Sequence, residues 1–238
     1  MIKLRYNTYP RLRSMIVPVA ALSVMLAGCD DGRIYDEDNG SGERDGLTVR
    51  FSADLTGTAE LGSGYTVALA GFTADGEYAE ISKNLTDGSQ DVTLAGVPAD
   101  VERVEVCLLN SIRKRIVTFA AVDVAPGDEI ISFDAGTLAV SDFDAIQEGI
   151  FTPSCERCHG AGGHAAAGLS LLLGQSREAL LNVESTVMPG KMRVSPGNPE
   201  ESTLWLAVGS GESDDWAFSH RELLTADRRD LILSWISR

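Results

Sequence analysis

Short runs in which apolar and polar residues alternate fill the chain from residue 47 to about residue 138. Alternation with a period of two places every second side chain on one face, so each run predicts a strand with one buried face. Turn-forming segments such as Ala74-Asp75-Gly76 and Pro126-Gly127-Asp128 separate the runs. This spacing predicts an antiparallel β-sandwich. The alternating apolar positions are Leu47, Val49 and Phe51; Tyr65, Val67 and Leu69; and Val104, Val106 and Leu108, with further β-rich runs at 92–94, 116–119 and 130–133.

The period of the pattern changes after Gly136. Ser141 is suited to cap a helix, and Phe143, Ile146 and Ile150 would share one face of it at three- and four-residue spacing. The later segments are also expected to be helical, so residues 139–238 predict a small all-α domain. The further helices are expected from an N-cap at Ser176 to about Asn182, from a cap at Asn198 with Pro199 at the first helical position to about Gly209, and from Thr225 through Leu231, Ile232, Trp235 and Ile236.

The N-terminal segment has the features of an export signal. Residues 1–14 carry four positive charges and no negative one, an apolar stretch runs from Met15 to Leu26, and Cys29 follows in Leu-Ala-Gly-Cys. This order resembles a bacterial lipoprotein signal, which implies cleavage after residue 28 and a lipid on the Cys29 thiol. An ordinary signal peptide and a short membrane anchor are the alternatives. The apolar stretch is shorter than the roughly 20 residues of a spanning helix, and Pro18 interrupts it.

Residues 30–45 are rich in Asp, Glu, Gly and Ser. Such a segment has too little apolar surface to offset the entropy of ordering it, so residues 29–46 are predicted to form a lipidated, acidic, flexible tether. Asp30 and Asp31 directly after Cys29 are suited to a sorting signal. We expect a cell-envelope location, with the lipid anchor in a bacterial membrane, most simply the outer one, and the chain in the periplasm or at the surface.

The charge of the chain limits its partners. The sequence holds 35 Asp and Glu against 20 Lys and Arg, and removal of residues 1–28 takes the net charge from −15 to −19. Binding of a phosphate backbone needs a basic surface, so nucleic acid is disfavoured. An acidic surface favours solubility and a partner protein with a basic docking face.

Residues 155–159 read Cys-Glu-Arg-Cys-His, the pattern of a c-type haem attachment site. The thiols of Cys155 and Cys158 can add to the two vinyl groups of one haem, because one helical turn spans that edge of the porphyrin. His159 follows directly and can turn its imidazole to the iron as the proximal ligand. The sequence therefore predicts one covalently bound haem c.

Other interpretations of the motif explain less of it. A redox Cys-x-x-Cys is expected after a strand in a βαβ unit, which the pattern lacks, and a zinc site needs a second pair of ligands at matching spacing. A disulfide between Cys155 and Cys158 would leave the adjacent histidine unexplained. Cys107 lies in the middle of a predicted strand, where a buried, inert thiol is expected.

About the last hundred residues resemble the single-haem cytochrome c domains attached to diverse bacterial exported proteins. The segments that carry the resemblance, in the family's order, are 146–151, the haem motif, 168–171, 194–199, 202–204 and 235–236. It implies a class I-like fold in which the helix before the motif crosses the C-terminal helix, with Gly149 at the crossing and Trp235 against it. The predicted fold class is two-domain: an antiparallel β-sandwich (47–138) followed by an all-α cytochrome c-like domain (139–238).

The chain departs from this family at the sixth iron ligand. The resemblance implies a methionine shortly before the last helix, but residues 216–225 contain none. His220 is the nearest residue able to bind iron, and bis-His ligation would lower the reduction potential relative to His-Met ligation. Met188 and Met192 are the sulfur alternatives, although they precede the Pro-Gly-x-Pro segment. An open or water-bound position is the remaining alternative.

Three functions are compatible with these features. Electron transfer outside the cytoplasm is the leading hypothesis; it needs no catalytic residue and implies a redox partner protein. A haem enzyme or sensor with an open distal site is the alternative that the missing methionine motivates. A surface binding protein whose β-domain recognises a glycan or a partner is the third. We therefore expect an electron carrier rather than an enzyme.

Overall fold

The computed structural model of the chain describes residues 46–160, 165–210 and 219–238. The segment Arg44–Arg238 forms a single compact unit through its internal contacts. The predicted signal peptide, Cys29 and the tether up to residue 45 lie outside the described residues, so they stay predictions. Among the helices of the described residues, none is both long enough and apolar enough to span a membrane.

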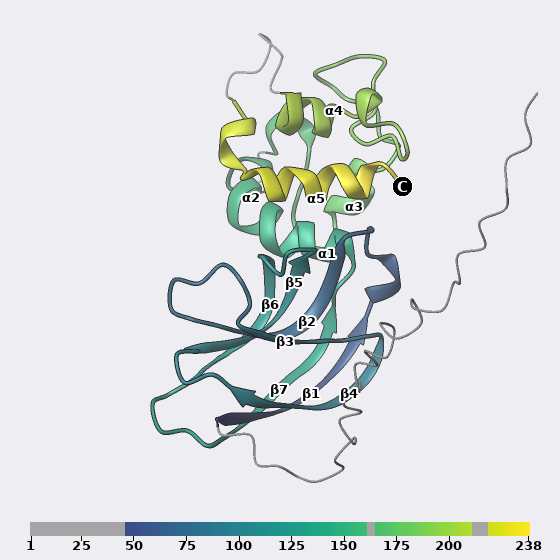
Figure 1. Cartoon of the computed structure of the whole chain (residues 1–238). Coiled ribbons are helices and arrows are strands. Elements are labelled where there is room, and N and C mark those ends of the chain that lie inside the picture. The colour runs from purple at the N-terminus through teal and green to yellow at the C-terminus, as the bar shows by residue number, and fades with distance from the viewer. Residues whose placement is uncertain (1–45, 161–164, 211–218) are drawn as a thin grey trace, which may run out of the picture. The chain divides into compact units, whose positions relative to one another are not determined.

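Seven strands of the described residues form two sheets (Figure 1). One sheet has the order β4-β1-β7 and the other the order β3-β2-β5-β6. Neighbouring strands are antiparallel, except that β1 and β7 run parallel. The strands are β1 (Leu47–Thr56), β2 (Tyr65–Phe72), β3 (Ile81–Asn84), β4 (Gly88–Val97), β5 (Arg103–Asn110), β6 (Arg115–Asp123) and β7 (Ile130–Ala139).

Burial along β1 alternates as the sequence predicts. Val49, Phe51, Ala53 and Leu55 are buried, whereas the residues that alternate with them, Arg50, Ser52 and Asp54, are exposed. These side chains share one hydrophobic core with residues of β2, β5 and β6. All the runs predicted from the sequence lie within the observed strands, so the prediction of strands is confirmed. β3, a short and half-exposed strand, was not predicted.

β2 and β5 are buried along nearly their whole length rather than in alternation. One face of these strands lies in the main core, and the other contributes to a second, smaller cluster that includes Phe72, Cys107 and Leu109. Cys107 is fully buried, and burial raises the pKa of its thiol. The expectation of a buried thiol at Cys107 is therefore confirmed.

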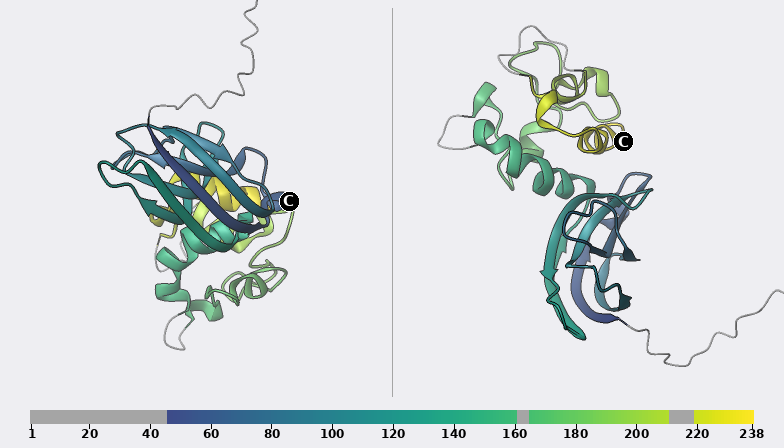
Figure 2. Two further views of the ribbon diagram at one scale, coloured as in Figure 1. Left: turned by 90° about the horizontal axis from the view of Figure 1, so that it is seen from below. Right: turned by 60° about the vertical axis from the view of Figure 1, so that its left-hand side comes forward.

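Helical segments follow β7 and gather at one end of the sheets (Figures 1 and 2). The first three form one continuous run that carries the Cys-x-x-Cys-His motif. They are α1 (Asp142–Ile146), the π-helical segment η2 (Gln147–Cys155) and α2 (Glu156–His159). The others are α3 (Ser176–Leu180), α4 (Thr203–Trp205), the π-helical η6 (Leu206–Ser210) and α5 (Ala226–Ile236), with 3-10 turns η4 (Ala166–Gly168), η5 (Pro199–Glu201) and η7 (Arg221–Leu223). A further 3-10 turn, η1 (Thr58–Glu60), lies between β1 and β2.

The predicted cap at Ser141 and the predicted start of the last helix at Thr225 are confirmed. The Ser141 hydroxyl accepts a hydrogen bond from the Asp144 N–H at 3.2 Å, and the Asp144 carboxylate accepts one from the Ser141 N–H at 2.9 Å. This reciprocal arrangement is a capping box. The Thr225 side chain likewise accepts a hydrogen bond from the N–H of Arg228 at the start of α5.

Two other helix predictions are wrong in detail. Ser176 is the first residue of α3 rather than its cap, and α3 ends at Leu180 instead of Asn182. The helix expected from Asn198 is broken, because the backbone of Ser202 is extended between η5 and α4. These segments are too short for periodicity alone to locate their ends.

The predicted fold class is wrong. Residues 139–238 are not an all-α cytochrome c-like domain, because the helices in the described part of this range are few and short and backbone bridges join segments such as Leu181 and Val194. The sheets are not purely antiparallel, because β7 returns beside β1 in parallel. Val117 of β6 and Ile150 of η2 also belong to one buried cluster, so strands and helices share a core. Periodicity shows which face of an element is buried but not which element covers it.

Gly149 marks a close contact between η2 and β6. A Cβ atom built on Gly149 would overlap Cγ2 of Val117, so no side chain fits without a shift of its neighbour. The resemblance placed Gly149 at the crossing with the C-terminal helix, whereas the structure places it against the sheet. Trp235 of α5 packs instead on Phe143 of α1, with ring centroids 5.0 Å apart.

Gly149→Ala is expected to lower the free energy of unfolding by about 1 kcal/mol or more. The overlap of the new methyl group with Val117 destabilises the fold by more than the better helix propensity of alanine stabilises it. Urea denaturation measures this loss. Val117→Ala opens the space, so the two changes together should cost less than their sum by about 0.5–2 kcal/mol. Glu148→Ala, at the exposed neighbouring position, is the control. Strictly additive losses would contradict the contact.

Candidate haem-attachment site

The motif lies at the end of the continuous helical run, which Figure 2 shows leaving the sheets. Ile150 and Phe151 are fully buried and anchor the run in the core. Pro153 has no backbone N–H, so the regular hydrogen-bond ladder is interrupted two residues before Cys155, within the π-helical turns. The buried half of the run therefore holds the motif at its more exposed end.

The two cysteines of the motif are free thiols on one stretch of helix. Side chains three residues apart are neighbours on a helix surface, so Cys155 and Cys158 emerge on the same side. Burial raises the pKa of Cys155 to about 11, and the nearby Cys158 and Glu156 add to the rise. A redox-active Cys-x-x-Cys needs a lowered thiol pKa, so this environment argues against thiol–disulfide catalysis.

One hydrogen bond orients the imidazole of His159. Its Nδ1 lies 3.1 Å from the carbonyl oxygen of Ala166 in η4. Since a carbonyl oxygen only accepts, Nδ1 is the donor in this hydrogen bond, and in the neutral form of the ring Nε2 then keeps its lone pair. Metal-binding histidines typically have their second ring nitrogen held in this way. His159 is therefore arranged to bind a metal through Nε2.

The ring of His220 lies beside that of His159. The two ring centroids are 6.2 Å apart, and the ring planes are inclined by 40°. His159 ends α2, and His220 directly precedes η7, so the structure brings together two residues from distant parts of the helical segment. The structure thus places the predicted proximal ligand next to one of its predicted distal partners.

The other candidates for a distal ligand have contacts elsewhere. Met188 donates its N–H to the Ser185 hydroxyl at 3.2 Å, and Met192 forms backbone bridges with Glu184 and Ser202. These contacts tie both methionines to the segment between α3 and α4. Residues 216–218, which precede His220 in the sequence, lie outside the described residues.

A buried polar network holds the motif helix against the segment that follows it. The Nε2 of Gln147 donates to the carbonyl oxygen of Leu171 at 3.1 Å and lies 3.3 Å from a carboxylate oxygen of Glu156. Its Oε1 accepts a hydrogen bond from the hydroxyl of Ser176 at 2.5 Å. The Leu171 N–H in turn donates to the carbonyl oxygen of His159 at 2.6 Å. Gln147 therefore holds the backbone at Leu171 in place, and Leu171 in turn holds the backbone of His159.

Gln147→Leu is expected to lower the free energy of unfolding by about 2 kcal/mol or more, because the buried Ser176 hydroxyl and Leu171 carbonyl lose their partner. Urea denaturation measures this loss. The same substitution at the exposed Gln175 is the control, with an expected change within about 0.5 kcal/mol. Equal losses in the two variants would show that the network does not stabilise the fold.

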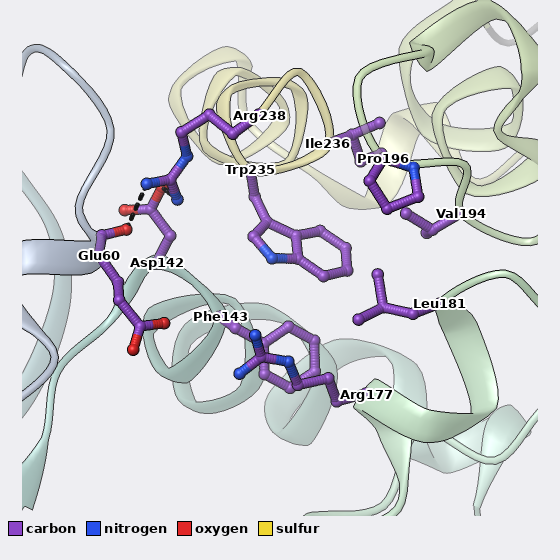
Figure 3. Close-up of a pocket in the computed structure, with 10 residues that line it drawn as sticks. All are labelled: Glu60, Asp142, Phe143, Arg177, Leu181, Val194, Pro196, Trp235, Ile236 and Arg238. Carbon is purple, nitrogen blue, oxygen red and sulfur yellow. Dashed lines mark hydrogen bonds and ion pairs between the residues drawn. The ribbon is translucent and has the colours of Figure 1, made fainter.

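A pocket of about 260 Å³ is lined by residues outside the motif (Figure 3). The Trp235 indole projects into it above Phe143, and the Arg177 guanidinium lies 5.6 Å from the centre of the Phe143 ring. The Arg238 guanidinium contacts the buried carboxylate of Asp142 and donates to the carbonyl oxygen of Glu60 at 2.5 Å. These contacts join α1, α3, α5 and η1. The residues around the pocket therefore hold these segments together.

The residues at the motif fit a covalent haem c. Two free thiols lie on one side of a helix, and the adjacent imidazole has Nε2 available for iron. Within the described ranges, His, Cys, Asp and Glu do not form a group of three or more that could hold a metal ion by themselves. A haem site does not need such a group, because the porphyrin supplies four of the iron ligands itself.

Comparisons with models of known protein families, with curated proteins and with solved structures find no match to this chain. The resemblance seen in the sequence therefore depends on the motif and on short segments alone.

Proposed function

We propose that this chain is a c-type haem protein that transfers electrons outside the cytoplasm. Cys155 and Cys158 would form the two thioether bonds to a single haem, and His159 would be an axial ligand of its iron. The observation that carries the proposal is the arrangement of His159 next to two free thiols, with its Nδ1 proton held by Ala166. The spacing of the motif and the exported character of the N-terminus support it.

When bound, the haem iron supplies a one-electron couple between its ferric and ferrous states. Cys155 and Cys158 would hold the edge of the group through two covalent links, and the Ala166 carbonyl would keep the His159 ring in its orientation. With the haem bound, the chain would accept one electron from a reduced donor protein and pass it to an oxidised acceptor protein, with no bond made or broken in the chain. The approach of His220 to His159 favours this role over catalysis at the iron, which needs an open coordination position.

We further propose that the chain is a lipoprotein of the cell envelope. The basic segment, the apolar stretch and Cys29 support a lipid anchor, and covalent haem attachment in bacteria takes place outside the cytoplasmic membrane. The mature chain would carry a net charge of −19 before the haem propionates are counted. A redox partner with a basic docking face would therefore be attracted to it, and nucleic acid would be repelled.

The proposal is tested with the full chain produced in bacteria that express the haem-attachment machinery. The expected result is a membrane-associated protein that keeps its haem on a denaturing gel and takes up one electron per chain in a reductive titration. An exported protein without bound haem would overturn the proposal.

A further inference from the structure

We infer that His220 is the second axial ligand, so that two histidines hold the iron and close it to external ligands. This inference rests on the proposed function, because it concerns the iron of the covalently bound haem. It selects one of three candidates that the sequence leaves open: His220, a methionine at 188 or 192, and an open position.

The separation of the two rings fits two ligands on opposite sides of one iron. A nitrogen of each imidazole lies about 2 Å from a metal that it binds, so ligands on opposite sides have ring centroids roughly 6 Å apart. The observed separation between His159 and His220 is 6.2 Å. The inclination of 40° between the ring planes is compatible with this arrangement, because axial imidazoles can rotate about the axis that joins them.

Hydrogen bonds from neighbouring segments hold the turn that begins at His220. The residue after it, Arg221, contacts the carbonyl oxygen of Gly209 in η6 through its guanidinium. The guanidinium of Arg229 in α5 donates to the carbonyl oxygens of Arg221 at 3.3 Å and Leu224 at 2.5 Å. The turn that begins at His220 is therefore tied to two neighbouring helical segments, which fixes the place from which the ring reaches toward His159.

Two consequences follow from ligation by two histidines. The iron would be six-coordinate and low-spin in both oxidation states, so carbon monoxide would not bind to the reduced protein. The reduction potential would be lower than with a methionine ligand, because a methionine sulfur raises the potential. Both consequences favour an electron carrier over a haem enzyme or sensor.

The test compares the full haem-loaded chain with His220→Ala and His220→Met. We expect a low-spin spectrum without carbon monoxide binding for the unmodified chain. His220→Ala should become high-spin and bind carbon monoxide, and added imidazole should restore the low-spin spectrum. His220→Met should stay low-spin, gain the far-red absorption band of a methionine bound to ferric haem and have a higher reduction potential.

The matched controls are His164→Ala, the third histidine of the chain, and Met188→Leu with Met192→Leu; all should keep the spectrum of the unmodified chain. A His220→Ala chain that keeps covalent haem and stays low-spin would overturn this inference and leave the proposed function standing. Absence of covalent haem from the unmodified chain would overturn both. If His220→Ala fails to fold, His220→Met still decides, because a missing methionine band would show that residue 220 does not face the iron.

Discussion

Replacement of Cys155 and Cys158 together by serine is expected to abolish the staining of the denatured chain for haem. Thioether bonds survive denaturation, whereas the bond between an axial histidine and iron does not. The two thiols are the ones that the structure places on one side of the helical run, next to His159. Each single variant keeps one possible link and should stain more weakly than the unmodified chain. Haem-stained denaturing gels, normalised to total protein, measure the effect.

The control for this experiment is Cys107→Ala. Cys107 is fully buried in β5 and belongs to a separate cluster, so its replacement should leave haem staining unchanged. Full staining of the double serine variant, or a selective loss in Cys107→Ala, would show that the motif is not the attachment site.

Phe151→Ala is expected to lower the free energy of unfolding by about 3–5 kcal/mol. Phe151 is fully buried, and its ring packs edge-on against that of Phe143, with the ring centroids 6.2 Å apart. A loss of this size is a large share of the roughly 5–15 kcal/mol that stabilises a typical domain. Because Phe151 lies in the core that the strands and helices share, the sheets and the helical segments should lose stability together.

Chemical denaturation followed by two probes measures this effect. All three tryptophans of the chain lie after residue 200, so their fluorescence reports on the part of the sequence after the strands, whereas far-ultraviolet circular dichroism also reports on the strands. The two transitions should coincide and shift together in Phe151→Ala. Phe119→Ala, at a half-buried position of β6, is the control with a smaller loss. Separate transitions would show that the strands and the helices unfold as independent domains.

The sequence predicts the strands well and their arrangement poorly. Alternation along Leu47 to Leu55 reports directly on burial, because successive side chains of a strand point to opposite faces. The parallel pairing of β1 with β7 depends on the path of the chain through the other sheet, which no local pattern records. The contact between Gly149 and Val117 also leaves no local pattern in the sequence, because Val117 lies on a strand that precedes the helical run.

The sequence predicts those residues of the candidate site that lie close together in one short motif. Cys155, Cys158 and His159 can be picked out of the sequence because covalent attachment of one haem would require this spacing. The carbonyl of Ala166 leaves no such signal, since every residue has one. Gln147 could have been found, because it lies four residues after Phe143 and thus on the buried face of the run.

The central claim is that one haem is bound covalently through Cys155 and Cys158, and peptide mass spectrometry tests it most directly. Chymotrypsin cleaves after Phe151 and leaves both cysteines in one peptide. The predicted result, for chain purified from the membranes of haem-attaching bacteria, is that this peptide carries the mass of one haem and no thiol that can be alkylated. A peptide of unmodified mass with two alkylatable thiols would contradict the claim.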